Sequence, residues 1–148
     1  LQVKVIEDLV NDALASGAKA IVGGKRLTDG AYAKGNFFAP TVLVDVTPDM
    51  RIAQEEVFGP VLLIMKFERD ADAVRIANGT VFGLQSSVFS KNQQRAERIA
   101  SQIEAGATVL NDFGMCYLNQ NLPFGGVKES GFGREGGLQG LRGYLNIV

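Results

Sequence analysis

Histidine is absent from this chain of 148 residues, and only one cysteine, Cys116, is present. The absence of histidine removes the commonest metal ligand and the usual general base, so we expect no metal site and no histidine-dependent catalysis. A single cysteine excludes an internal disulfide. This favours a reducing compartment, and therefore a cytoplasmic location.

Charge of one sign does not accumulate: 15 basic and 16 acidic residues give a formal net charge of −1, and no stripe of Lys and Arg forms. Nucleic acid and anionic membrane are therefore not the expected partners. No stretch of 18 apolar residues and no signal-like segment occurs, so no membrane span is expected. The expected partner is a small molecule or another protein chain.

The length allows one good hydrophobic core, and one domain is expected. The chain opens at Leu1 without Met. We therefore expect a piece of a longer protein, although natural processing or an expression boundary would give the same start.

The stretch from Glu55 to Pro60 places two acids and an aromatic ring directly before the most apolar run of the chain. In an extended segment positions i and i+2 share a side, so Glu56 and Phe58 are predicted to face one space and Glu55 another. A carboxylate accepts two hydroxyl donors, and a neighbouring ring can cover a flat heterocycle. The alternative is a solvated turn acid beside an aromatic anchor of the core. Because neighbouring residues point apart, Glu55 and Glu56 do not form a converging acid pair of the glycosidase type.

Hydrophobic periodicity predicts helices and strands that alternate along the chain. The predicted helices are 2–16, a turn at 50–53, 70–78, 92–104 and a short helix at 137–141; the predicted strands are 41–46, 61–67, 85–90, 108–111 and 144–148, and 20–22 is a short apolar run. Asp70 is the predicted N-cap of its helix, and Gly17 and Gly106 are predicted C-caps. This alternation predicts an α/β fold of three layers, with a largely parallel sheet and helices on both faces. Ligands gather at the carboxyl ends of such strands, where Asn111 is predicted to lie.

The loop 112–127 has no helix or strand period, yet it is rich in apolar and aromatic residues. Such residues either pack beneath another element or line a pocket. Cys116 in this loop has no histidine to activate it, so we expect a small apolar side chain rather than a nucleophile.

Two glycine-rich patterns near the end have simpler interpretations than catalysis. Residues 131–136 match G-x-G-x-x-G, but no predicted strand precedes them and no room remains for the second strand and its acid, so tight turns are expected. Lys128 and Ser130 have the spacing of a turn rather than the order of a Ser-Lys dyad, and a structural role is expected for both.

Together, three segments resemble the aldehyde dehydrogenase superfamily: residues 55–60 with the apolar run behind them, Asn111, and residues 122–136 with the sequence Pro-Phe-Gly-Gly at 123–126. The resemblance implies oxidation of an aldehyde to an acid with NAD or NADP, through a thiohemiacetal and a thioester on a catalytic cysteine. It implies that Glu56 binds the nicotinamide ribose and that Phe58 lies by the nicotinamide. The implied substrate pocket comprises Asn111, Phe113, Met115, Cys116, Tyr117 and Phe124.

The same resemblance implies that much of the enzyme lies outside this sequence. The nucleophilic cysteine, the general-base glutamate, the oxyanion asparagine and the nucleotide-binding domain of the family have no counterpart here, so residues 1–148 would be a C-terminal portion of the catalytic domain, inactive alone. The family also implies a homo-oligomer for the full-length protein. The competing hypothesis is a non-catalytic module that binds a ligand or partner in a relic pocket.

Overall fold

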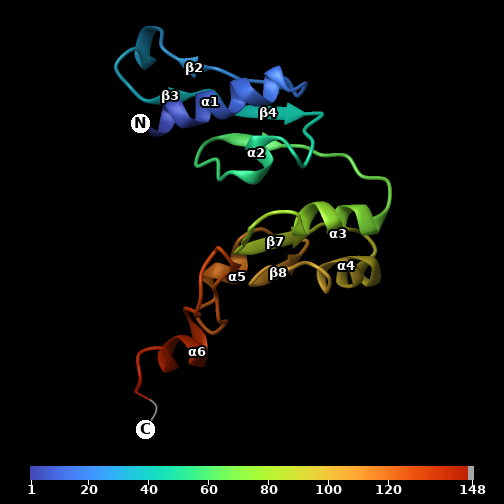
Figure 1. Cartoon of the computed structure of the whole chain (residues 1–148). Helices are drawn as coiled ribbons and strands as arrows, with labels where there is room; N and C mark the ends of the chain where they lie inside the picture. Colours follow the sequence, from blue (N-terminus) through green and yellow to red (C-terminus); the bar gives the residue numbers. More distant parts are fainter. Residues whose placement is uncertain (147–148) are drawn as a thin grey trace. The chain divides into compact units, whose positions relative to one another are not determined.

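The computed structural model describes residues 1–146, except for the side chain of residue 115, and it divides into two compact units. The first unit runs from Leu1 to Phe67 and the second begins at Glu68. Figure 1 shows the helices and strands of each unit along the chain. No helix in the described part of the chain is long and apolar enough to cross a membrane.

The first unit is built on a long amphipathic helix and a small mixed sheet. Its elements are α1 (Gln2–Ala15), β1 (Lys19–Val22), β2 (Arg26–Leu27), the 3-10 helix η1 (Gly30–Tyr32), β3 (Phe37–Phe38), β4 (Thr41–Val44), α2 (Arg51–Gln54) and β5 (Val61–Leu63). The sheet has the order β1-β4-β5, with β1 antiparallel and β5 parallel to β4. A separate pair, β2 with β3, is antiparallel.

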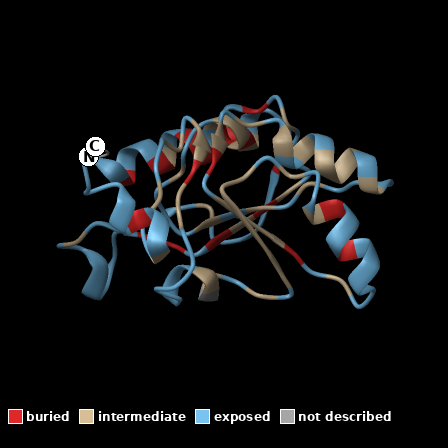
Figure 2. Cartoon of the chain, turned by 90° about the horizontal axis from the view of Figure 1, so that it is seen from below, coloured by how far each residue is buried: buried red, intermediate tan, exposed pale blue. Residues whose placement is uncertain are grey.

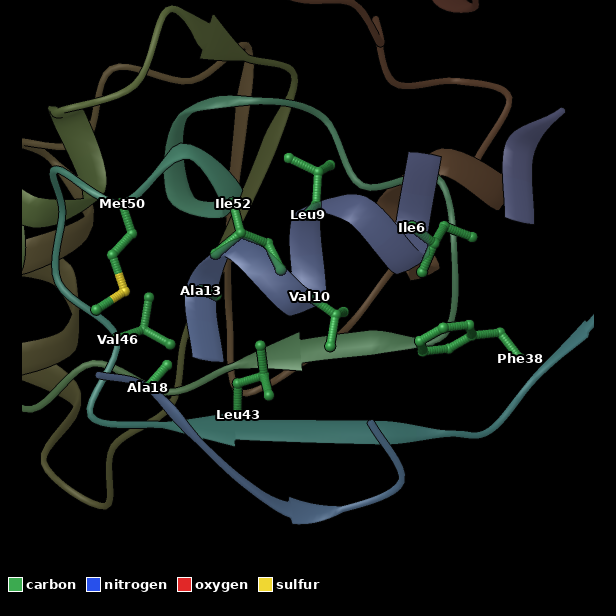
Figure 3. Packing of buried hydrophobic residues seen from close by; sticks show 10 residues of the cluster. All are labelled: Ile6, Leu9, Val10, Ala13, Ala18, Phe38, Leu43, Val46, Met50 and Ile52. Carbon is green, nitrogen blue, oxygen red and sulfur yellow. The ribbon is translucent and has the colours of Figure 1, made fainter. Parts of the chain in front are cut away.

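The core of the first unit follows from the apolar stripe of α1. That stripe buries Val3, Ile6, Leu9, Val10 and Ala13, the spacing that the sequence predicts. Figure 3 shows how the α1 side chains point toward Leu43 of β4 and toward Ile52 of α2, with the ring of Phe38 near Ile6 and Val10. Burial of each large aliphatic side chain contributes about 1.5–3 kcal/mol, so this cluster is the main source of stability of the unit.

The predicted C-terminal end of α1 is confirmed, whereas the strand predicted at 61–67 is shorter than expected. Gly17 has φ +106°, the left-handed conformation that glycine adopts after a helix. The strand β5 ends at Leu63, and Leu62 is 59% exposed. The prediction of a strand covered on both faces was wrong for the described residues, because Val61 and Leu63 pack against the core while Leu62, on the other face, is exposed.

The second unit contains a β-α-β crossover. Its elements are α3 (Asp70–Asn78), β6 (Phe82–Gly83), β7 (Gln85–Val88), α4 (Gln93–Ala100), β8 (Ala107–Leu110), α5 (Met115–Leu118), β9 (Val127–Lys128) and α6 (Gly137–Arg142). Strands β7 and β8 are parallel with α4 between them, as predicted, and β6 pairs with β9 in antiparallel fashion. The core of this unit is small, with Val88, Ala96 and Ile99 buried. In Figure 2 buried positions are a minority of the ribbon, and most of it is intermediate or exposed.

Both caps predicted for the second unit were wrong in detail. Asp70 is the first residue of α3 rather than its N-cap, and its carboxylate accepts hydrogen bonds from Arg95 (2.6–3.1 Å) and from Arg98 (3.2 Å) on α4. The hydrogen bonds from Arg95, reinforced by Arg98, hold the pKa of the Asp70 carboxyl below its usual value. The helix α4 ends at Ala100, before Gly106. Gly106 instead lies against the backbone of Gly125, where no side chain would fit.

The last predicted strand, 144–148, is not a strand within the described residues. Backbone amides of Tyr144 and Leu145 bond to Leu141 and Arg142, which continues the turn that ends α6. Residues 147–148 lie outside the part that the structure describes.

Candidate functional site

The Glu55–Pro60 segment leaves α2 with Glu55 in an extended conformation, and Val57 is its one half-buried residue. Val57 packs against the core of the first unit, whereas Glu56 is exposed and the ring of Phe58 is 74% exposed. This is the pattern expected when Val57 points inward and its two neighbours point outward. An acid and an aromatic ring therefore stand free beside each other, neither of them part of the core.

The two neighbouring glutamates differ in what they contact. The carboxylate of Glu55 accepts two hydrogen bonds from Arg51, at 2.8 and 3.2 Å, one helical turn before it. The carboxylate of Glu56 has no hydrogen bond or ion pair with any residue in the described part of the chain. Only Glu56 is therefore available to accept hydroxyl donors from a ligand.

The backbone that carries this pair is firmly held. A β-carbon on Gly59 would overlap the tip of Ile6 and would lie 2.9 Å from its Cγ1, so α1 touches the backbone there directly. The side chain of Gln2 donates to the Phe58 carbonyl at 3.4 Å, and the Thr41 amide donates to the Pro60 carbonyl at 2.8 Å. The segment is thus fixed to both the helix and the sheet of its unit.

A hollow of about 460 Å³ opens next to Phe58, between the first turn of α1 and the loop before β4. Phe37 and Phe38 supply further aromatic surface, and Gln2 and Asn36 supply polar groups. Sequence reasoning missed these residues, because no local pattern connects the start of α1 with Asn36 and strand β3. Their proximity is a product of the fold of the unit.

In the second unit, Asn111 follows β8, as predicted, but its side chain is occupied. Its Oδ1 accepts from the Ser90 amide at 2.8 Å and its Nδ2 donates to the Ser90 carbonyl at 3.0 Å. Its backbone is left-handed, with φ +53°, a conformation that asparagine tolerates well. Asn111 thus extends the pairing of β7 and β8 by one residue beyond the strands.

Two of the predicted pocket residues, Tyr117 and Phe124, are brought together. Their rings pack edge to face with centroids 5.0 Å apart. Both line a hollow of about 680 Å³, to which Arg134, Glu135 and residues of α6 also contribute. Tyr117 reaches it from α5, a single helical turn inside the loop that was predicted to have no regular structure.

Among the described side chains, Asn111, Phe113 and Cys116 do not line that hollow. Phe113 is 84% exposed, and Cys116 is a half-buried free thiol. The side chain of Met115 lies outside the described part. Among the described residues, no group of three acids or cysteines is placed to hold a metal ion.

The glycine-rich end forms tight turns, as its sequence predicts. Gly131, Gly133, Gly136 and Gly137 all have positive φ. The strand before this segment, β9, has only two residues and is antiparallel, unlike the long parallel strand of a dinucleotide-binding unit. Arg134 donates through Nη1 to the carbonyls of Gly126 (2.9 Å) and Gly133 (2.6 Å), which holds the turn against the preceding segment.

Relatives with this sequence pattern are numerous. The profile of the aldehyde dehydrogenase family matches residues 1–148. The putative aldehyde dehydrogenase-like protein C21C3 of Schizosaccharomyces pombe is 47% identical over 95% of the chain, which spans 27% of that protein. The 3-sulfolactaldehyde dehydrogenase of Pseudomonas putida is 41% identical over 98% of the chain, which spans 29% of its length.

Solved structures agree. The betaine aldehyde dehydrogenase of Staphylococcus aureus, in complex with NAD+, matches with a TM-score of 0.91 and 41% identity over 98% of this chain and 28% of that one. The likeness confirms the predicted fold class, a partial α/β catalytic domain of the aldehyde dehydrogenase type. The chain therefore spans less than a third of the length of the proteins that it matches. By profile, by sequence identity and by fold, this chain belongs to the aldehyde dehydrogenase family.

Proposed function

We propose that this chain is the C-terminal portion of the catalytic domain of an enzyme that oxidises an aldehyde to a carboxylic acid with NAD or NADP. A cysteine thiolate supplied by another part of the enzyme adds to the aldehyde carbon and gives a thiohemiacetal. Bound NAD or NADP would supply the acceptor for the hydride of that carbon, and hydrolysis of the resulting cysteine thioester would release the acid and the thiol. In this proposal Cys116 is not that nucleophile, in keeping with a thiol that forms no hydrogen bond or ion pair with any residue in the described part.

Glu56 and Phe58 are the cofactor-binding residues of this proposal. The nicotinamide ribose offers two adjacent hydroxyl groups, and the unpaired carboxylate of Glu56 has the acceptor capacity for both. The exposed ring of Phe58 offers a flat apolar surface to the nicotinamide. The proposal rests on one observation: Glu56 has no partner among the described residues and Phe58 is exposed, while Ile6 and Thr41 fix the backbone of their segment.

The aldehyde is proposed to contact the second unit at the Tyr117–Phe124 ring pair. This pair forms an apolar wall of the hollow there, suited to an organic side chain. Phe113, Met115 and Cys116 belong to the same loop and are proposed to contact the substrate from it. Both amide atoms of the Asn111 side chain bond to the backbone of Ser90, so in this proposal Asn111 holds the start of that loop in place.

The test uses the longest natural protein that contains this sequence, with Glu56→Gln compared against Glu55→Gln. Both changes remove one charge from the same segment, but only Glu56 is free for a ligand. We expect Glu56→Gln to raise KM for the cofactor or lower kcat roughly tenfold, the loss that follows from weakening one charge-assisted hydrogen bond. Glu55→Gln should match the wild type. Equal kinetics for Glu56→Gln and the wild type would refute the role of Glu56.

Two measurements separate this function from a non-catalytic module. The pure chain of 148 residues should form no NADH or NADPH from an aldehyde, and activity of that material would refute the proposal that the nucleophile lies elsewhere. The mass of the natural protein, read with an antibody to this region, should be several times that of the chain. A natural product of 15.9 kDa would favour the ligand-binding module instead.

We also propose that the full-length protein is a homo-oligomer and that it lies in the cytoplasm. The apolar residues of α6 and the following turn are exposed, among them Leu138, Leu141 and Tyr144. Contiguous exposed apolar groups favour association. Light scattering of the natural protein should give a multiple of the subunit mass, and a monomer would contradict the proposed oligomer. Cell fractionation should place the protein with cytosolic markers, and recovery from an organelle would contradict the proposed location.

A further inference from the structure

Lys128 adopts a backbone conformation that lysine rarely takes. It is the second residue of β9, opposite Phe82, and its φ is +56°. The left-handed region suits glycine or asparagine, and any other residue there carries strain that the surroundings must offset. The side chain of Lys128 supplies that compensation.

The Lys128 ammonium is surrounded by three oxygens. Nζ lies 3.0 Å from the Asn78 carbonyl, 3.1 Å from the Thr80 carbonyl and 3.0 Å from Oε2 of Glu104. An ammonium has three N–H donors, so each donor has one acceptor. The side chain is only 23% exposed, which makes these interactions stronger than those of an ion pair in open solvent.

One of these oxygens belongs to the last residue of a helix, and the Thr80 carbonyl lies just beyond that helix. Asn78 is the last residue of α3, and the final carbonyls of a helix lack partners and carry its partial negative charge. A cation at this place satisfies them, although it comes from 50 positions further along the chain. The side chain of Asn78 meanwhile donates to the Gln102 carbonyl at 2.8 Å and accepts from the Glu104 amide at 2.9 Å. Lys128 thus completes a polar network between α3 and the turn after α4.

The network also fixes the segment that bears Phe124. Directly after Lys128, the Glu129 amide donates to the Val81 carbonyl at 3.0 Å, and Ser130 Oγ accepts from the Gly83 amide at 2.9 Å. On either side of Lys128, Phe124 and Glu135 exchange both backbone hydrogen bonds, at 2.7 and 2.6 Å. The ring of Phe124 is therefore presented from one end of a closed loop, 124–135, that contains Lys128.

We propose that Lys128 is a positioning residue of the proposed substrate pocket: its ammonium, held by the carbonyls of Asn78 and Thr80 and by Glu104, keeps residues 124–135 in the conformation that presents Phe124 to Tyr117. The role of the pocket rests on the proposed function. The positioning itself does not, and its test reads backbone protection rather than activity. When the side chain is truncated, the three oxygens form a site of the right composition for a small primary ammonium ion.

The experiment measures amide hydrogen exchange by NMR in the chain with Lys128→Ala. We expect the Phe124 and Glu135 amides to exchange roughly tenfold faster or more, as the loss of charge-assisted hydrogen bonds predicts, while the Val109 amide in β8 changes little. Ethylammonium should restore the protection at Phe124 and Glu135. Tetramethylammonium, which has no N–H donor, should not. Lys91→Ala, the loss of an exposed lysine that has no ion pair with the described residues, is the matched control.

A second variant separates the charge from the backbone. Lys128→Gly relieves the strain at φ +56° and still removes the ammonium, so we expect it to lose protection as Lys128→Ala does. If Lys128→Gly keeps full protection at Phe124 and Glu135, or if Lys128→Ala exchanges like the wild type there, the proposal is overturned. If Lys128→Ala does not fold, Glu104→Gln should accelerate the same two amides by a smaller factor, and unchanged exchange in that variant overturns the proposal as well.

Discussion

A methyl group added at Gly59 tests how the Glu55–Pro60 segment is held. In Gly59→Ala the new β-carbon would overlap Ile6 Cδ1 and lie 2.9 Å from Cγ1. Ile6 is 3% exposed and sits within the core, so it has little room to rotate away. Overpacking of a core costs about 1–3 kcal/mol, and we expect a loss of unfolding free energy in that range.

A second change at Ile6 makes the prediction specific. Ile6→Val removes the methyl group that the new side chain would overlap, and alone it should cost about 0.5–1.5 kcal/mol. In the double variant that space is filled by the Gly59→Ala methyl, so the combined loss should be smaller than the sum by about 1 kcal/mol. Ile99→Val in the core of the second unit removes the same methyl group away from Gly59 and is the control. With Gly59→Ala it should be additive.

Urea unfolding followed by circular dichroism gives the four free energies of each cycle. Because the chain has two compact units, the transition should also be checked for a second step before a single free energy is assigned. Simple additivity of Gly59→Ala with Ile6→Val would show that α1 does not limit the backbone at Gly59. The account of a firmly held Glu56–Phe58 pair would then be wrong.

Three further predictions concern the second unit. The pKa of the Asp70 carboxyl is lowered on folding, so its contribution to stability is present above the unfolded pKa and is lost as the pH falls through the folded pKa. Asp70→Asn should therefore flatten the acid side of a stability–pH curve measured by thermal melts. An unchanged curve would contradict this. Asn111→Ala removes two hydrogen bonds to Ser90 and should cost about 1–2 kcal/mol in urea unfolding, with a loss near zero as the refuting result. Gly106→Ala would place a methyl group onto the Gly125 carbonyl and should abolish the cooperative melt of this unit, whereas a normal melt would show that the contact is readily relieved.

Local sequence was a good guide wherever one element could be judged by itself. The apolar stripe of α1, the left-handed Gly17 after it and the strands β4, β7 and β8 all follow from periodicity and turn chemistry. The shared exposure of Glu56 and Phe58 was also predictable, because an extended backbone places positions i and i+2 on the same side.

Contacts between distant segments were not accessible in this way. Asp70 looked like a helix cap, but Arg95 and Arg98 on another helix attract its carboxylate more strongly than the backbone amides of α3 do. Gly106 looked like a helix end, yet its role is to admit the backbone of Gly125. In each case the residue type suits the predicted helix cap, but a partner far along the chain determines the contact that the residue makes.

The sequence by itself determined the family resemblance and the two residues, Glu56 and Phe58, that best suit a nicotinamide cofactor. The local helical turn of α2 decided which acid of the Glu55–Glu56 pair is free, because it brings Arg51 to Glu55 at i,i+4 spacing. Only the tertiary structure decided that the start of α1 and Phe37 and Phe38 lie around the hollow next to Phe58. It also decided that Lys128, which in sequence is one residue of a glycine-rich turn, closes the end of α3. The physical reason is that charge and hydrogen-bonding capacity are properties of a residue, whereas their satisfaction depends on what the fold brings within about 3 Å.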